Sequence, residues 1–468
     1  MVQCIIYYTF IFGGFVLITD ESNIRKNIVN FSVPSILEQS LFMVVGVVST
    51  IFVGRISTEA ISAVGLINIL FGFIMVLFVA LSTGCTVLVA RLVGEEDIDM
   101  AKEAMRQSIT LGIAISLFFS VICYIFAIPI INIFFRRADI EVIRLADIYF
   151  KITLYTLPLA LINIITSGSL KGAGDARTPM AIAYIVNIVN VLLSYVLIFG
   201  VNFSSIRLTG YGITGAAYAV AVSRGIGGIL SIAVLFIPQN IININIFEKF
   251  KIRMDIIRRI LNVGIPAAIE QILMQGGILL LQVLISGMGT TAIAVYQIGM
   301  SINSIAYIPV WGLGITATTL IGQSFGARKQ ELAEKYGWDI FKIALLLIVA
   351  LTLVIITFAD KLMGIYSNDP EVIRTGTAAI RIFSLSQPFL AAVVVFAGGL
   401  RGAGDIMYVM VTSFVGIWVF RILLTVILDR LFKMGIMGVW VAFCMDFFIR
   451  SIMYYIRFKR GRWKNIVV

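Results

Sequence analysis

The chain has 468 residues, of which 60% are hydrophobic and 13% charged, and its formal net charge is +11. A soluble protein carries about 25% charged residues, so this composition excludes a soluble globular protein and indicates a polytopic helical membrane protein. Histidine is absent, so proton chemistry would have to rest on carboxylates. The positive charge is concentrated in short loops and at the C-terminus, where membrane topology explains it, and we expect no nucleic-acid partner.

The first residues form an aromatic-rich apolar stretch, Met1–Ile18, followed by a polar segment. This stretch lacks a basic start and a small-residue cleavage site, so it is a poor signal peptide. An extra helix, an interfacial segment and an artefact of start-codon choice all remain open. We assign residues 1–30 to an N-terminal apolar lead-in and polar linker.

The hydropathy pattern predicts an all-α protein with twelve transmembrane helices, because a bilayer core needs about 20 predominantly apolar residues per helix. The expected spans are 31–54, 60–90, 106–135, 141–168, 177–200, 212–238, 256–286, 291–321, 337–359, 372–398, 406–428 and 436–458. The spans form two pseudo-symmetric six-helix lobes, residues 31–238 and 256–458. A cytoplasmic linker, residues 239–255, joins the lobes, and a basic cytoplasmic tail, residues 459–468, follows the second lobe.

The distribution of lysine and arginine sets the expected orientation. Most of the 36 basic residues fall in connections that are cytoplasmic if both termini are cytoplasmic. Because basic residues are enriched in cytoplasmic loops, we expect a multi-pass protein of the plasma (cytoplasmic) membrane with both termini in the cytoplasm. In a cell with two membranes, this is the inner membrane.

The two lobes repeat several motifs. Leu170–Asp175 reads Leu-Lys-Gly-Ala-Gly-Asp and Leu400–Asp405 reads Leu-Arg-Gly-Ala-Gly-Asp, each at the end of the fourth span of its lobe. We interpret both as structural turns, with the cation and the acid at a water-facing edge. Pro34-x-x-x-Glu38-Gln39 likewise returns as Pro266-x-x-x-Glu270-Gln271. Parallel repeats of six spans are a transporter architecture with alternating access.

These motifs resemble those of the multidrug and toxic compound extrusion (MATE) transporters. The resemblance rests on the Gly-Ala-Gly-Asp turn with Thr178-Pro179, on Thr50–Arg55 and on Thr319–Ala327, and it covers residues 30–458. It implies a V-shaped pair of six-helix bundles that exports organic, often cationic, amphiphiles by using a proton or sodium gradient.

The chain departs from this family at the positions where many members carry acidic residues. Ser49 and Ser194 stand where many members have aspartate, although Asn190 is kept, and Met274 and Leu390 lie near the positions of two further acids. The chain therefore lacks, at these positions, the acids that the resemblance implies for ion coupling.

The candidate coupling residues are Glu38 and Glu270, one helical turn after a proline in symmetry-related spans. A carboxylate in a low-dielectric environment can take up and release a proton near neutral pH. Capping or ion pairing at the helix ends is the structural alternative. Asn190, Ser49 and Ser194 could instead bind Na⁺ weakly, although interhelical hydrogen bonding is the simpler interpretation of such residues.

Candidate substrate contacts are the polar, aromatic and methionine side chains of spans five, seven and eight, because aromatic faces bind organic cations and methionine adapts to varied ligands. They are Asn187, Met274, Tyr296, Gln297, Asn303, Tyr307 and Trp311. Packing is the alternative for each. Among the intramembrane charges, we expect Asp446 and Arg450 to form an ion pair. We expect Arg421 to form an ion pair or to extend to the membrane interface, and the role of Arg224 stays open between these two and a contact with substrate.

The leading hypothesis is a secondary exporter of small amphiphilic organic compounds that uses H⁺ or Na⁺ antiport, needs no cofactor or metal, contacts membrane lipids and works as a monomer. No nucleotide-binding G-x-x-x-x-G-K-[ST] loop occurs in the sequence, which argues against direct use of ATP. A flippase for lipid-linked precursors and a coupling-deficient sensor or relic are the alternatives. We do not expect an enzyme.

Overall fold

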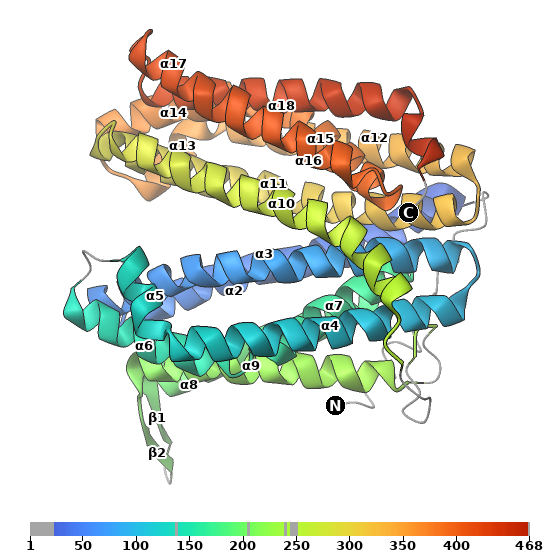
Figure 1. Ribbon diagram of the computed structural model, residues 1–468. Helices are drawn as coiled ribbons and strands as arrows, with labels where there is room; N and C mark the ends of the chain where they lie inside the picture. The colour runs from blue at the N-terminus through green and yellow to red at the C-terminus, as the bar shows by residue number, and fades with distance from the viewer. Residues whose placement is uncertain (1–22, 136–138, 204–205, 238–240, 244–250, 467–468) are drawn as a thin grey trace. The chain divides into compact units, whose positions relative to one another are not determined.

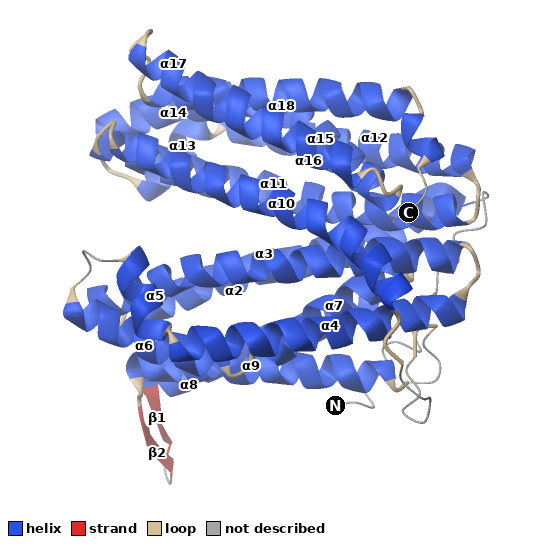
Figure 2. Ribbon diagram, viewed as in Figure 1, coloured by secondary structure: helices blue, strands red, loops and turns tan. Residues whose placement is uncertain are grey.

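The computed structural model describes residues 23–135, 139–203, 206–237, 241–243 and 251–466. Within them the chain is almost entirely helical (Figures 1 and 2). The Met1–Ile18 stretch and part of the 239–255 linker lie outside the described residues.

The chain divides into two compact units. Of the described residues, unit 1 contains those within 37–93 and 97–264, and unit 2 contains those within 23–36, 94–96 and 265–466. The elements of the first half are α2 (Ile24–Gly54), α3 (Thr58–Gly94), α4 (Ile98–Ile125), α5 (Ala127–Phe134), α6 (Ile140–Leu154), α7 (Leu157–Gly172), α8 (Arg177–Phe199), β1 (Gly200–Phe203), β2 (Ile206–Thr209) and α9 (Gly212–Leu235). Those of the second half are α10 (Met254–Ser286), α11 (Thr290–Gly326), α12 (Gln330–Thr357), α13 (Ala359–Tyr366), α14 (Pro370–Ser384), α15 (Gln387–Gly402), α16 (Ile406–Phe414), the π-helix η2 (Val415–Leu423), α17 (Leu424–Arg430), α18 (Ile436–Lys459) and the 3₁₀ turn η3 (Arg462–Asn465).

The described helices account for the predicted membrane spans. Ten helices are long and apolar enough to cross a membrane, and two bent helix pairs bring the number to as many as 12. The all-α polytopic fold class is confirmed.

Two spans predicted as continuous are each broken into two helices. The axes of α6 and α7 meet at 55°, and those of α14 and α15 meet at 48°. Pro158 and Pro388 lie in the first turn of α7 and α15. Proline lacks a backbone donor and is tolerated where a helix begins, so each proline starts a new helix.

Two further details differ from the predicted spans. The span 106–135 is interrupted at Phe126, which ends α4 and precedes the short helix α5. The β1–β2 hairpin follows α8 and was not predicted; it pairs Gly200 with Thr209 and projects from the ends of α8 and α9 (Figure 2). Gly200 has φ +76°, a conformation that glycine adopts without the penalty other residues incur.

The first helix of each lobe is shared between the two units. α2 belongs to unit 2 up to Ile36 and to unit 1 from Leu37, whereas α10 belongs to unit 1 up to Gly264 and to unit 2 from Ile265. Both changes fall within three residues of the repeated prolines, Pro34 and Pro266.

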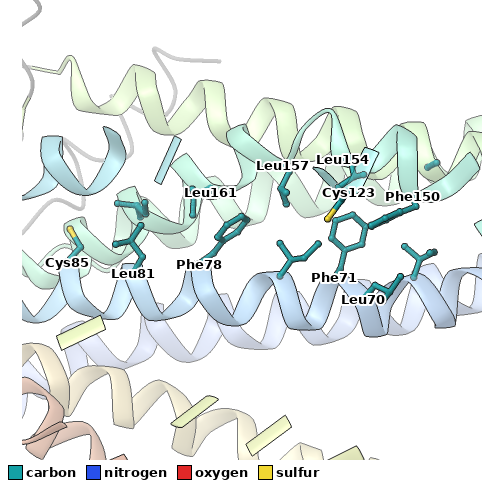
Figure 3. Packing of buried hydrophobic residues seen from close by; sticks show 14 of the residues in the cluster. Leu70, Phe71, Phe78, Leu81, Cys85, Cys123, Phe150, Leu154, Leu157 and Leu161 are labelled. Carbon is teal, nitrogen blue, oxygen red and sulfur yellow. The ribbon is translucent and has the colours of Figure 1, made fainter. Parts of the chain in front are cut away.

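The core of unit 1 is built on α3, whose apolar side chains pack against α4, α6 and α7 (Figure 3). Phe71 and Phe150 meet edge to face with ring centroids 5.5 Å apart. Farther along α3, the helix α7 approaches so closely that a Cβ atom on Gly172 would lie 2.6 Å from the Thr86 carbonyl oxygen. Close packing of small residues is the usual way in which membrane helices associate, and it fixes the end of α7 against α3.

Candidate site: two buried carboxylate–cation pairs

The two hexapeptides adopt the same helix-ending turn. In unit 1 the Asp175 amide donates to the Leu170 carbonyl (2.8 Å) and the Gly174 amide to the Lys171 carbonyl (2.9 Å). Leu400–Asp405 repeats both bonds at 2.7 and 2.9 Å. Gly174 and Gly404 have φ +97° and +84°. This hydrogen-bond pair with a left-handed glycine is the Schellman motif, which explains why the glycine is repeated.

In unit 1 the turn places Lys171 on Glu38. The Lys171 Nζ atom lies 2.8 Å from both Glu38 carboxylate oxygens and donates a hydrogen bond to Oε1. Both residues are buried, with 8% and 3% of their surface exposed. The interpretation of this cation as water-facing is therefore wrong, because Lys171 turns inward to neutralise a buried carboxylate.

Unit 2 repeats the pair with more hydrogen bonds. Arg401 donates from Nη2 to Glu270 Oε1 (2.6 Å) and from Nε to Oε2 (3.3 Å). Ser413 also donates to Oε1 (3.0 Å) and lies 3.2 Å from the Tyr454 hydroxyl. Tyr454 in turn donates to the Val409 carbonyl (3.1 Å). Glu270 is therefore held by a network, whereas Glu38 is held by one ammonium group.

The acids that close the turns differ between the units. Asp175 accepts hydrogen bonds from the amides of Arg177 (2.9 Å) and Thr178 (3.0 Å), so it caps the start of α8. Asp405 instead accepts from Arg457 Nε on α18 (2.7 Å). Both acids serve to anchor the turn.

Each pair joins the first helix of its lobe to the fourth, α2 to α7 and α10 to α15. A buried ion pair is stable only while both charges are present, and removing one charge is strongly destabilising. A proton that neutralised Glu38 or Glu270 would cancel its attraction to the cation and loosen the first helix of the lobe from the fourth. The predicted carboxylates and the repeated turns, which no sequence spacing connects, thus form one site in each unit.

The predicted polar pocket of unit 1 comes together in part. The Ser49 hydroxyl lies 3.4 Å from the Asn190 side-chain oxygen and donates to it. Asn187, Asn190 and Ser194 are buried on α8. Among the described residues the Asn187 Nδ2 atom has no hydrogen-bond partner, so this amide remains available to a ligand.

The predicted polar–aromatic band of α11 does not form one surface. Tyr296 and Asn303 are buried, and Asn303 accepts a hydrogen bond from Gln387 (2.9 Å). Gln297 is exposed and Trp311 is 40% exposed. Tyr307 packs edge to face on Phe383, whereas Met274 on α10 is half-buried. These six residues, together with Asn187, stay candidate substrate contacts.

Unit 2 also contains a buried charge cluster of which the sequence predicted only the Asp446–Arg450 pair. That pair is confirmed, with Arg450 Nε 2.5 Å from Asp446 Oδ1. Arg421, on the π-helix, contacts the same carboxylate, and its guanidinium lies 4.1 Å from the Phe443 ring centroid. Gly416 allows this packing, because a Cβ atom there would collide with Asp446 and Arg450. Two cations share one acid, so the cluster carries a surplus positive charge.

Unit 1 also contains a surplus cation, Arg224 on α9. Its guanidinium stacks over Phe71 at 5.0 Å from the ring centroid. Among the described residues its Nη1 atom is buried without a hydrogen-bond partner, and no carboxylate forms an ion pair with it. No local sequence pattern distinguishes a stacked arginine from a paired one, so the sequence could not decide its role.

Long apolar helices, duplicated lobes and buried charges at repeated positions define an integral membrane transporter. The family model MatE matches residues 34–196 and 266–427, so the chain belongs to the MatE family. It is 29% identical to a probable multidrug resistance protein NorM of Thermotoga maritima, over 95% of this chain and 94% of the relative. It is 24% identical to the multidrug export protein MepA of Staphylococcus aureus, over 82% and 83%.

Solved transporter structures share the fold. A MATE transporter in its bent conformation superimposes with a TM-score of 0.86 at 21% identity, covering 94% of this chain and 95% of the other. A MOP superfamily transporter from Pyrococcus furiosus, described as having a binding pocket of reverse polarity, gives 0.84 at 23% identity over 93% and 95%.

Proposed function

We propose that the protein is a secondary active exporter of amphiphilic organic compounds, in which protonation of Glu38 and Glu270 is coupled to transport. The multidrug resistance names of its relatives support the export role. The observation that carries the coupling proposal is the repeated burial of a carboxylate against the cation of a helix-ending turn.

In this mechanism each pair ties the first helix of its lobe to the fourth. Proton uptake removes the carboxylate charge and releases the cation from its partner. Loss of the proton restores the pair. Alternating access in repeat-built transporters requires helices to shift between two packings, and a pair that opens on protonation gives the ion gradient a way to bias that shift.

The test is transport of a fluorescent organic cation into proteoliposomes under an imposed pH gradient or an imposed sodium gradient. The wild type is compared with Glu38→Gln and Glu270→Gln. The matched control is Glu334→Gln, since Glu334 pairs with Lys464 (2.6 Å) near the start of α12. We expect pH-driven transport in the wild type and the control, and a loss of about tenfold or more in both test variants, as removal of ~1.4 kcal/mol would give.

Transport driven only by sodium and unchanged in both variants would overturn the coupling proposal. It would move the coupling site to Asn190, Ser49 and Ser194. Because glutamine keeps the size of glutamate, size-exclusion profiles in detergent serve to show that each variant is folded before its transport is measured.

A second candidate function is export of anionic amphiphiles, including lipid-linked precursors. The unpaired Arg224 and the surplus positive charge of the Arg421–Asp446–Arg450 cluster favour it, because guanidinium groups bind carboxylate and phosphate well. The same proteoliposomes with a fluorescent anionic amphiphile distinguish the two. Preference for the anion, reduced in Arg224→Gln, would favour this function over export of cations.

A further inference from the structure

We propose that unit 2 contains a binding site for the phosphate of an anionic membrane phospholipid, in the cleft between α13 and α14. The cleft has a volume of about 550 Å³. Its lining comprises Asp360, Pro370, Ile373, Arg374, Thr377, Ala378 and Arg381. All of these residues belong to α13 or α14.

The register of α14 places two guanidinium groups on one face of the helix. Arg374 and Arg381 are two turns apart, which corresponds to about 10 Å along the axis. The intervening Thr377 and Ala378 line the same cleft. The opposite face carries the buried side chains of Val372 and Ile380. The arginine face is thus free to contact a ligand.

Within the part of the chain that the structure describes, both arginines are unpaired. Among the described residues neither Arg374 nor Arg381 forms an ion pair, and both are exposed. The buried Thr377 hydroxyl between them has no hydrogen-bond partner in the described chain. Asp360 also lines the cleft, so its formal charge is +1. Guanidinium groups hold phosphate through paired hydrogen bonds, and a hydroxyl beside them offers a further donor.

The equivalent helix of unit 1 shows what neutralises such a face. α6 and α14 are both 15 residues long, and a basic residue stands at the fifth and twelfth positions of each. In α6, Arg144 lies 3.5 Å from Glu141 and Lys151 lies 2.8 Å from Asp147. Asp147 is the eighth residue of α6, where α14 has Thr377. The counterpart of Glu141 is kept in α14 as Glu371, whereas the acid that pairs with Lys151 has no counterpart beside Arg381.

The location of the cleft favours a lipid over a soluble anion. α14 begins the bent span that ends, after α15, at the Arg401 turn, so the cleft lies near one surface of the membrane. Exposed apolar side chains flank it, with Ile365 on α13 76% exposed and Leu385 after α14 68% exposed. A short helix with exposed apolar residues beside cations is suited to the boundary between headgroups and acyl chains.

The experiment is native mass spectrometry of the delipidated full chain, titrated with phosphatidylglycerol or phosphatidylcholine. We compare the wild type with Arg374→Ala/Arg381→Ala and with Thr377→Asp, which gives unit 2 the acid of unit 1. Matched controls are Arg144→Ala/Lys151→Ala in α6 and the conservative Thr377→Ser. Melting temperatures in detergent show that every variant is folded.

We expect one phosphatidylglycerol to bind the wild type and both controls, with affinity about tenfold weaker in the two test variants because charge-assisted hydrogen bonds are lost or already satisfied. Equal binding by all variants, or equal binding of phosphatidylcholine, would overturn the proposal. Complete displacement of the lipid by inorganic phosphate at the same concentration would show that the site binds the free anion, and would overturn the lipid assignment.

Discussion

The two units hold the same carboxylate in different ways. Glu38 depends on a single ammonium group, Lys171, whereas Glu270 is bound by both Arg401 and Ser413. Arginine also offers a fixed fork of donors that lysine lacks. The repeat therefore preserves the charge pair but not its strength, and we expect the pair of unit 1 to open more readily than the pair of unit 2.

The largest effect on stability is expected from Asp446→Asn. This substitution removes a buried acid of unit 2 that has no acidic counterpart in unit 1. It leaves Arg421 and Arg450 buried without a counter-charge, which costs about 3–5 kcal/mol. Gly212 and Gly215 of α9 return as Gly435 and Gly438 at the start of α18, and this register places Ser223 opposite Asp446. The Ser223 hydroxyl donates to the Ala219 carbonyl (2.6 Å). Thermal unfolding in detergent should show a large loss for Asp446→Asn and a small one for Ser223→Ala. Equal losses would contradict the assignment of the cluster.

The next largest effect comes from removing the cation of each carboxylate–cation pair, which compares the strengths of the two pairs directly. Lys171→Met leaves one buried charge unpaired, that of Glu38, and should destabilise the fold by about 3 kcal/mol, the lower end of the range for breaking a buried pair. Arg401→Met should cost less, because Ser413 still donates to Glu270 and because Arg401 is more exposed than Lys171. The double variant Glu38→Gln/Lys171→Met should recover part of the loss in the same unfolding assay. A double variant no more stable than Lys171→Met would mean that packing, not charge, holds α2 to α7.

A smaller effect is expected from removing the hydroxyl group that binds Glu270, which tests why the pair of unit 2 is stronger. Ser413→Ala removes one hydrogen bond to the Glu270 carboxylate and should cost about 0.5–1.5 kcal/mol. In the Ser413→Ala background, Arg401→Met should then approach the loss seen for Lys171→Met. If the loss of stability for Arg401→Met stayed as far below that for Lys171→Met as it is without Ser413→Ala, Ser413 would not contribute to the stronger pair.

The smallest expected difference in stability is between variants of the two hexapeptide turns, Leu170–Asp175 and Leu400–Asp405. Gly174→Ala and Gly404→Ala each place a Cβ atom at a positive φ, which costs about 1–2 kcal/mol. Because the hydrogen bonds of the two turns are nearly identical, the two losses in melting temperature should agree. Clearly unequal losses would show that one turn is strained by its surroundings.

Much of this fold could be predicted from the sequence. Charge-free apolar windows predict the spans, and the repeated hexapeptides predict the duplication, because both signals are local. The breaks before Pro158 and Pro388 were missed because a proline within an apolar run fits either a kinked span or the start of a new helix. The π-helix around Arg421 has no local sequence signal either.

The site was predicted only in its parts. Glu38 and Glu270 stand out as intramembrane acids, and the hexapeptide cations stand out as repeats. Each acid meets its cation more than 130 residues away in sequence, and no spacing rule connects them. The packing of Gly172 on α3, and of Gly402 on α11, brings the cation to the acid.

The central claim is that a proton competes with the cation for each buried glutamate. Infrared difference spectroscopy with and without a transported organic cation detects the carbonyl band of a buried carboxyl group that changes its protonation during transport. We predict such a band in the wild type, a weaker band in Glu38→Gln and in Glu270→Gln, and none in the double variant. A band of full strength in the double variant would contradict the account, because the proton would then reside on other carboxylates.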